Sequence, residues 1–140
     1  MNRSIAILVA IFALFTSIAA IAAGQSSDPA KAAEQFYAGY LTLVNASKDT
    51  TSWVAKSHLV TANFKKSYAK KMSAGDVDAD PVIQAQDTPT SPFKATKTTI
   101  DGKKATVILT TKYANATHKL SVNMLLTNGV WQLDAVSPVK

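Results

Sequence analysis

The sequence predicts a single α+β domain in which N-terminal helices pack on a curved antiparallel sheet of four strands. Two observations lead to this fold class. Apolar residues recur at spacings of three and four over residues 28–72, which is the repeat of an amphipathic helix. From Phe93 onward, apolar and polar residues alternate and turn sequences separate the runs, which is typical of strands joined by hairpins. Helices followed by a meander of strands place the helices against one face of the sheet.

Residues 1–23, which precede this domain, have the composition of a secretory signal peptide. Arg3 is followed by the uncharged stretch 4–23, which begins with an apolar run and ends in small residues, and polar Gln25 follows. We expect cleavage at this end, leaving one domain over residues 24–140 that is periplasmic or secreted and has no membrane anchor. The alternative is a retained anchor, because an apolar stretch of about 20 residues is near the spanning minimum.

The helices are predicted from their caps and their apolar stripes. Asp28 can accept hydrogen bonds from free N–H groups, and Pro29 suits the first helical position, so we expect a helix over 28–46. A second helical region begins near Thr50, and a third helix extends over 61–72. The apolar positions expected to face the sheet are Ala33, Phe36, Tyr37, Tyr40, Leu41, Val44, Phe64, Tyr68 and Met72.

The strands are predicted from alternation and from two turn sequences. Asp101-Gly102 and Asn128-Gly129 both suit tight hairpins, because Asn and Gly tolerate the positive φ that such turns require. The expected strands are 94–100, 103–113, 117–127 and 130–139, and segment 82–87 is expected to be a short strand or a helical turn. By strand parity, Asp134 faces solvent. The side chains expected to face the helices are Leu120, Val122, Met124, Trp131 and Leu133.

The composition limits the classes of partner. The chain has 15 Lys+Arg, 9 Asp+Glu and no cysteine, with a net charge of +6, so it forms no disulfide. A basic balance can indicate a nucleic-acid partner. The lysines are scattered, however, and the single arginine, Arg3, lies in the predicted signal peptide. Because arginine is the residue that reads bases and phosphates bidentately, no nucleic-acid partner is expected.

An acidic segment is the one weak candidate for a metal site. Asp76, Asp78, Asp80 and Asp87 have the spacing of carboxylate ligands in a calcium-binding loop. Pro81 stands where that loop needs glycine for its sharp turn, and its φ is fixed near −65°. We therefore expect an acidic turn whose side chains cap neighbouring backbone, and we predict no metal or other cofactor.

The last strand carries a family resemblance. Helices followed by a four-stranded meander that ends on Asn-Gly-Val-Trp-Gln-Leu-Asp-Ala-Val, residues 128–136, resemble the nuclear transport factor 2-like (cystatin-like) superfamily. The Asp-Ala-Asp-Pro segment 78–81 and the Gln-Ala-Gln-Asp segment 84–87, with Phe-Tyr and Tyr-Leu pairs at 36–37 and 40–41, also resemble an uncharacterised family of exported bacterial proteins with that fold. The resemblance implies a fold and an export route, and it implies no activity.

The resemblance also raises the possibility of a ligand pocket. Enzymes of the superfamily place an Asp base and a tyrosine donor in the cone between helices and sheet, as ketosteroid isomerases do. Here the candidate pocket residues are Tyr37, Tyr40, Tyr68 and Trp131. Since Asp134 is expected to point away, we predict a cavity that holds tyrosine hydroxyls and no carboxylate.

Catalytic motifs are otherwise missing from the sequence. His58 and His118 lie on different predicted elements, and no Gly-x-Ser-x-Gly elbow is present. We therefore expect a non-catalytic binding protein whose partner is an envelope protein or a small apolar ligand. Two alternatives stay open. One is a small lyase or isomerase that uses a tyrosine with a carboxylate or histidine in the cone, and the other is a toxin-neutralising, immunity-type protein.

Overall fold

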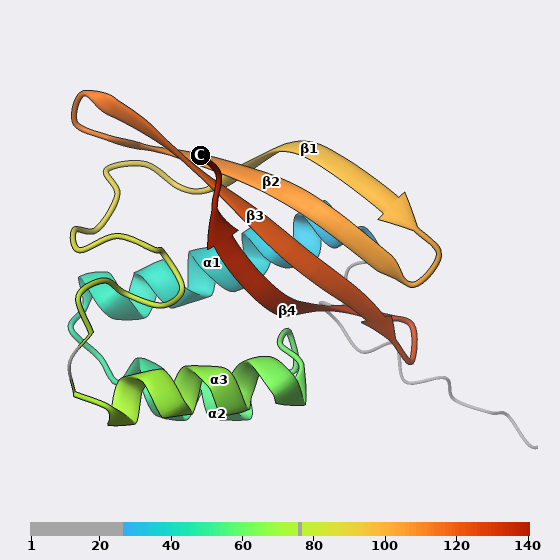
Figure 1. Ribbon diagram of the computed structural model, residues 1–140, viewed down its shortest axis with the longest axis horizontal. Helices are drawn as coiled ribbons and strands as arrows, with labels where there is room; N and C mark the ends of the chain where they lie inside the picture. The colour runs from blue at the N-terminus through green and yellow to red at the C-terminus, as the bar shows by residue number, and fades with distance from the viewer. Residues whose placement is uncertain (1–26, 76) are drawn as a thin grey trace, which may run out of the picture.

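The computed structural model describes residues 27–75 and 77–140, so the predicted signal peptide and Asp76 lie outside the described residues. Three helices and a four-stranded antiparallel sheet make up this part of the chain, which confirms the predicted α+β class (Figure 1). The sheet has the order β1-β2-β3-β4, so every strand pairs with its neighbour in sequence. The elements are α1 (Pro29–Asn45), α2 (Thr50–Lys56), α3 (Ala62–Ser73), β1 (Lys94–Asp101), β2 (Lys104–Tyr113), β3 (Ala116–Thr127) and β4 (Val130–Pro138).

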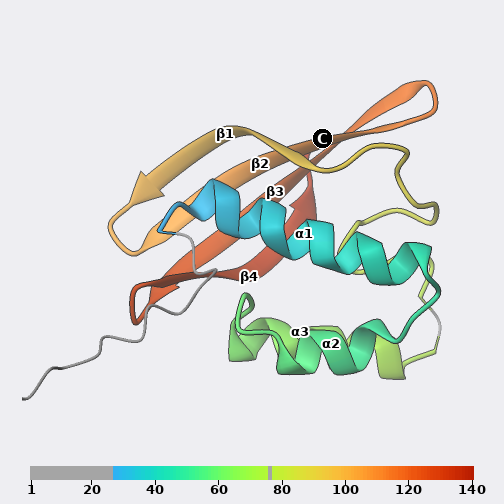
Figure 2. The ribbon, with the colours of Figure 1, turned by 180° about the vertical axis from the view of Figure 1, so that it is seen from behind.

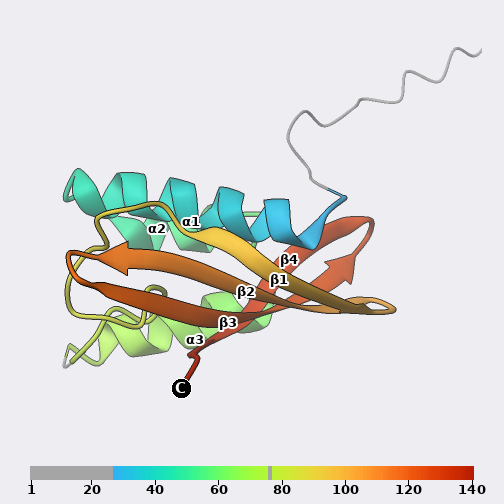
Figure 3. The same ribbon diagram turned by 90° about the horizontal axis from the view of Figure 1, so that it is seen from above.

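The helices cover one face and one edge of the sheet. Helix α1 contacts all four strands, whereas α3 contacts β4 and packs on α2. Seen from behind, α1 crosses the sheet while α2 and α3 lie side by side below the β4 edge (Figure 2). Seen from above, the twisted sheet lies over the helices, with α1 toward its β1 side and α3 on the opposite side of the picture (Figure 3). None of the helices in the described residues has the length and apolar character needed to cross a lipid bilayer.

The predicted caps form as the sequence indicates. The Asp28 carboxylate accepts a hydrogen bond from the Ala30 N–H at 2.9 Å, and the Thr61 hydroxyl accepts one from the Phe64 N–H at 3.1 Å. Each cap satisfies a backbone donor that has no partner within its own helix. These local interactions fix where α1 and α3 begin.

The core lies between α1 and the sheet. Phe36, Tyr37 and Tyr40 of α1 are fully buried, and Phe36 lies 5.4 Å from Trp53 of α2 between ring centroids. The side chains predicted to face the helices from β3 and β4 are all buried, which confirms the expected strand parity up to residue 133: Leu120, Val122, Met124, Trp131 and Leu133. The turn between these strands has φ of 51° at Asn128 and 78° at Gly129, as predicted.

Asp134 departs from the predicted parity. Asn123 pairs with Ala135 and Met124 pairs with Leu133, so Asp134 is an extra residue, a β-bulge, in β4. On the other side of β4, the Thr61 N–H donates to the Leu133 carbonyl at 3.0 Å, which brings the start of α3 next to the bulge. Asp134 therefore turns toward α3, and the prediction that it faces solvent away from the helices is wrong.

Segment 82–87 was expected to be a short strand or a helical turn. It forms turns and no strand. The Asp80 carboxylate accepts hydrogen bonds from the Val82 and Ile83 N–H groups, at 2.7 and 2.9 Å through Oδ1, which confirms the capping role expected of it. Both apolar side chains are buried. The acidic segment is thus held against the core by the carboxylate of Asp80.

Candidate functional site

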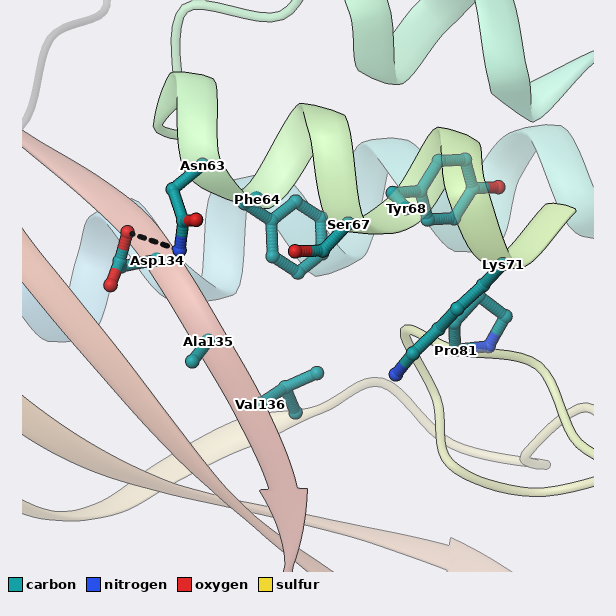
Figure 4. Close-up of a pocket in the computed structure, with 9 residues that line it drawn as sticks. All are labelled: Asn63, Phe64, Ser67, Tyr68, Lys71, Pro81, Asp134, Ala135 and Val136. Carbon is teal, nitrogen blue, oxygen red and sulfur yellow. Dashed lines mark hydrogen bonds between the residues drawn. The ribbon is translucent and has the colours of Figure 1, made fainter.

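A groove of about 220 Å³ lies between α3 and β4 (Figure 4). Its floor is apolar, with Phe64 of α3 facing Val136 of β4, and its ends are polar. Asp134 and Asn63 lie at one end, while the Lys71 side chain extends across the other end beside Pro81. The full lining is Asn63, Phe64, Ser67, Tyr68, Lys71, Pro81, Asp134, Ala135 and Val136.

Asp134 is half-buried and only partly satisfied at its end of the groove. Its Oδ1 accepts a hydrogen bond from the Thr61 hydroxyl at 2.7 Å and a long one from the Asn63 side-chain amide at 3.5 Å. Within the described residues, Oδ2 has no hydrogen-bond partner. This cavity thus contains a carboxylate, which corrects the prediction that any cavity would hold only tyrosine hydroxyls.

The carboxylate and the tyrosine hydroxyls do not form a catalytic pair. Tyr68 lines the groove with its ring, but its hydroxyl lies 2.8 Å from Thr50 Oγ1 and 3.1 Å from the Tyr40 hydroxyl. In the described part of the chain, no tyrosine hydroxyl makes a hydrogen bond to Asp134. Isomerase-type chemistry needs a base and a donor that converge on one position, and Asp134 and the tyrosines do not supply that pair in this groove. The ring centroids of Tyr113 and His118 lie 5.6 Å apart beside another hollow, so the tyrosine-and-histidine alternative stays a prediction.

The hydroxyls form instead a chain of hydrogen bonds whose direction is fixed by its last acceptor. The Tyr40 hydroxyl donates to Asp80 Oδ2 at 2.7 Å, so it must accept from Tyr68, and Tyr68 must in turn accept from Thr50. Burial, the hydrogen bond with Tyr68 and the Asp80 charge together raise the pKa of Tyr40 far above its ordinary value. Tyr40 is therefore a neutral structural donor at physiological pH.

Tyr37 has a similar structural role. Its hydroxyl donates to the Val82 carbonyl at 2.9 Å, and burial, followed by the Asp80 charge, raises its pKa well above the ordinary value. Trp131 is also buried and donates through Nε1 to the Ser27 carbonyl at 3.1 Å. Of the four predicted pocket residues, only Tyr68 lines the groove, and a ligand role for any of them stays a prediction.

The calcium candidates are not gathered into a metal site in the described residues. Both oxygens of Asp80 accept hydrogen bonds from protein groups, Oδ1 from backbone N–H groups and Oδ2 from Tyr40. Among the same residues, no three or more His, Cys, Asp or Glu side chains cluster so that they could hold a metal ion. Asp76 lies outside the described residues, so the expectation of weak or no calcium binding stays a prediction.

The two histidines lie in different parts of the fold. His118, in β3, is half-buried, and its Nε2 donates to the Ile83 carbonyl at 3.0 Å. His58 is exposed between α2 and α3. Neither ring makes a hydrogen bond to a serine hydroxyl in the described chain, so no serine nucleophile and base are paired there.

Positive charge gathers on the helix that forms one wall of the groove. Helix α3 carries four lysines, Lys65, Lys66, Lys70 and Lys71, and no acidic residue. The one ion pair between described residues joins Lys94 to Glu34 at 3.6 Å, on the far side of α1. The α3 lysines are therefore available to pair with an external anion. The sequence showed these lysines, but it did not show that one of them lies over a groove.

Comparison with known proteins identifies a fold and no family. No protein-family model and no curated protein matches the sequence. A chain of the native type VI effector-immunity complex Tae3-Tai3 from Ralstonia pickettii matches with a TM-score of 0.71 and 14% identity, over 82% of this chain and 98% of that chain. A chain of the SeMet form of that complex matches with a TM-score of 0.64 and 15% identity, over 81% and 98%. At such identities, the likeness shows a shared fold.

Proposed function

We propose that this chain is an exported, immunity-type protein that neutralises an effector by binding it and catalyses no reaction. The observation that carries the proposal is the fold, which spans 98% of a chain taken from an effector-immunity complex with a TM-score of 0.71. A groove beside a helix whose lysines make no ion pair with the described residues supports a protein partner. The proposal adopts the toxin-neutralising alternative of the sequence analysis, and a resident envelope protein or a small apolar ligand becomes the lesser alternative.

The chemistry of the chain favours the immunity side of such a pair over the effector side. An effector that is an enzyme needs a nucleophile or base within reach of the reacting atom. The sequence has no cysteine, and the groove carboxylate of Asp134 makes no hydrogen bond to a tyrosine or histidine in the described residues. A protein that only has to occupy a partner's surface needs none of these groups.

The proposed compartment is the bacterial periplasm. It rests on the uncharged, small-residue-terminated stretch 4–23 after Arg3, which has the pattern of a cleaved signal peptide. An immunity protein must meet its effector where the effector acts. Export therefore implies that the effector attacks a target in the cell envelope.

Growth protection tests this proposal. The protein encoded beside the gene for this chain is directed to the periplasm of a bacterial host, with and without this chain. We expect the neighbour alone to stop growth, the full-length chain to restore it, and a form lacking residues 2–23 to fail because it stays in the cytoplasm. If no neighbouring product is toxic, or if protection does not depend on this chain, the immunity proposal is wrong.

A further inference from the structure

The β4 edge is open where it borders the groove. Val60 forms the one bridge to the outer side of β4 in the described residues, at Leu133, and the chain then turns away into α3 after Thr61. The rest of that edge, Ala135 to Ser137, has no strand beside it in the described structure and lies below α3 (Figure 4). An unpaired strand edge presents backbone donors and acceptors that another extended segment can use.

The side chains around this edge favour an acidic occupant. Lys71 extends over the groove and makes no ion pair with another described residue, and α3 carries no acidic residue. A second hollow adjoins the first, because Lys71 and Pro81 line both. Asp78 and Asp80 also line this second hollow, so the occupant's carboxylate belongs at Lys71 and its neutral residues belong beyond it. Asp134 Oδ2, at the opposite end, is an acceptor for the occupant's backbone N–H groups.

We propose that an extended, acidic segment of the effector adds to the open edge of β4 as a short strand and fills the groove below α3. The identity of the partner as an effector rests on the proposed function. The backbone pairing supplies affinity, and the pocket side chains supply selectivity, as in other cases of strand addition. An apolar side chain of the segment contacts Phe64 and Val136, and a carboxylate pairs with Lys71.

A peptide-display experiment tests the groove without knowledge of the effector. A library of random short peptides is selected on the chain lacking its first 23 residues, and the enriched peptides are synthesised for titration. The test variant is Lys71→Glu, and the matched control is Lys66→Glu, an exposed lysine of the same helix that does not line the groove. Versions of each peptide with alternate backbone amides N-methylated keep the side chains but cannot pair as strands.

We expect acidic peptides with alternating apolar residues. Their affinity should fall about tenfold or more in Lys71→Glu, because attraction becomes repulsion at a contact, and should change little in Lys66→Glu. N-methylation should abolish binding, and hydrogen exchange of the whole chain should show new protection at residues 135–137. Failure to enrich any peptide overturns the inference, as does enrichment of peptides that bind Lys71→Glu equally well or that tolerate N-methylation.

The experiments distinguish a failure of the groove inference from a failure of the proposed immunity function. If Lys71→Glu still protects cells fully from the effector, the chain is an immunity protein whose interface lies elsewhere, and the groove inference is wrong. If peptides bind as expected but growth protection fails, the groove is a strand-binding site and the immunity proposal is wrong.

Discussion

At the scale of residues, two tyrosine hydroxyls are in opposite situations. The Tyr40 hydroxyl donates to Asp80 and accepts from Tyr68, whereas the Tyr113 hydroxyl is buried with no hydrogen-bond partner in the described structure. Net stabilisation by a buried hydrogen bond is modest, but a buried polar group left unpaired carries its full desolvation cost. The two positions should therefore respond differently to the same change.

We expect Tyr40→Phe to lower the free energy of unfolding by about 1–3 kcal/mol, because it leaves the Asp80 carboxylate and the Tyr68 hydroxyl short of a partner. Tyr113→Phe removes an unsatisfied group and should leave the stability unchanged or raise it by about 1 kcal/mol. Urea denaturation of both variants measures the difference. Equal destabilisation of the two would contradict the hydrogen-bond assignments.

The same tyrosines predict how stability depends on pH. Burial is the first cause of the raised pKa of Tyr40 and of Tyr37, so each keeps its proton in the folded state after the unfolded chain has lost it. Their contribution to stability is thus fully present below a pH of about 10, the ordinary tyrosine pKa, and is lost as the pH rises above it. We expect phenolate absorbance from these residues to appear only with unfolding. Loss of the Tyr40 proton while the protein is still folded would contradict this explanation.

At the scale of elements, the packing of α1 on α2 depends on a glycine. A Cβ at Gly39 would lie 2.7 Å from Cζ2 of Trp53, too close for the ring to stay in place. The Trp53 ring also packs on Phe36, so it cannot move freely. The missing side chain at Gly39 thus lets the Trp53 ring of α2 lie directly against α1.

For Gly39→Ala, two effects compete. Alanine favours the helix by about 1 kcal/mol, while overpacking against Trp53 costs about 1–3 kcal/mol, so we expect net destabilisation. In a Trp53→Ala background the steric effect disappears, and the same change should stabilise the protein. Thermal unfolding of the four proteins in this double-mutant cycle provides the check. A Gly39→Ala effect of the same sign and size in both backgrounds would show that the ring does not limit the approach.

The elements that were predictable are those set by neighbouring residues. The Asp28 and Thr61 caps and the Asn128-Gly129 turn each depend on contacts within three residues, so the sequence displays them directly. The orientation of Asp134 was not predictable, because it depends on a bulge in β4 and on the pairing of Val60 with Leu133. Strand parity holds only while the register is unbroken.

The groove could not be predicted for the same reason. Its walls come from α3 and β4, which are distant in sequence, and Lys71 is one of many lysines in a basic chain. Tyr68 was found because aromatic residues are few and conspicuous. The structure buries all four predicted pocket residues in the core, and Tyr68 differs from Tyr37, Tyr40 and Trp131 only in that its ring also borders the groove.

At the scale of the whole molecule, the proposed export is a property of residues outside the described structure. Cleavage at the small residues after the apolar run should give a mature product that starts between Ala23 and Gln25. N-terminal sequencing of the chain recovered from the periplasm measures this. Recovery of an intact Met1 in the membrane fraction would refute both the export route and the immunity role in the envelope.

The shape of the molecule suits a neutralising role, because a closed core leaves its lysine-bearing helix and an open strand edge to contact another protein. Association should be favoured by charge, since the chain carries +6, or +5 once Arg3 is removed with the predicted signal peptide, and the α3 lysines are unpaired in the described structure. Raising the salt concentration should therefore slow binding more than it speeds dissociation. This behaviour distinguishes a charge-guided protein interface from an apolar ligand pocket.

The central claim is that this chain binds an effector and leaves it chemically unchanged. Isothermal titration of the mature chain against the purified toxic product of the neighbouring gene, followed by mass spectrometry of the recovered effector, tests it most directly. We predict a dissociation constant of about 1 nM or below, the range of tight inhibitor complexes, and an effector of unaltered mass. The account would be contradicted if no heat of binding is detected, or if the recovered effector is cleaved or chemically modified.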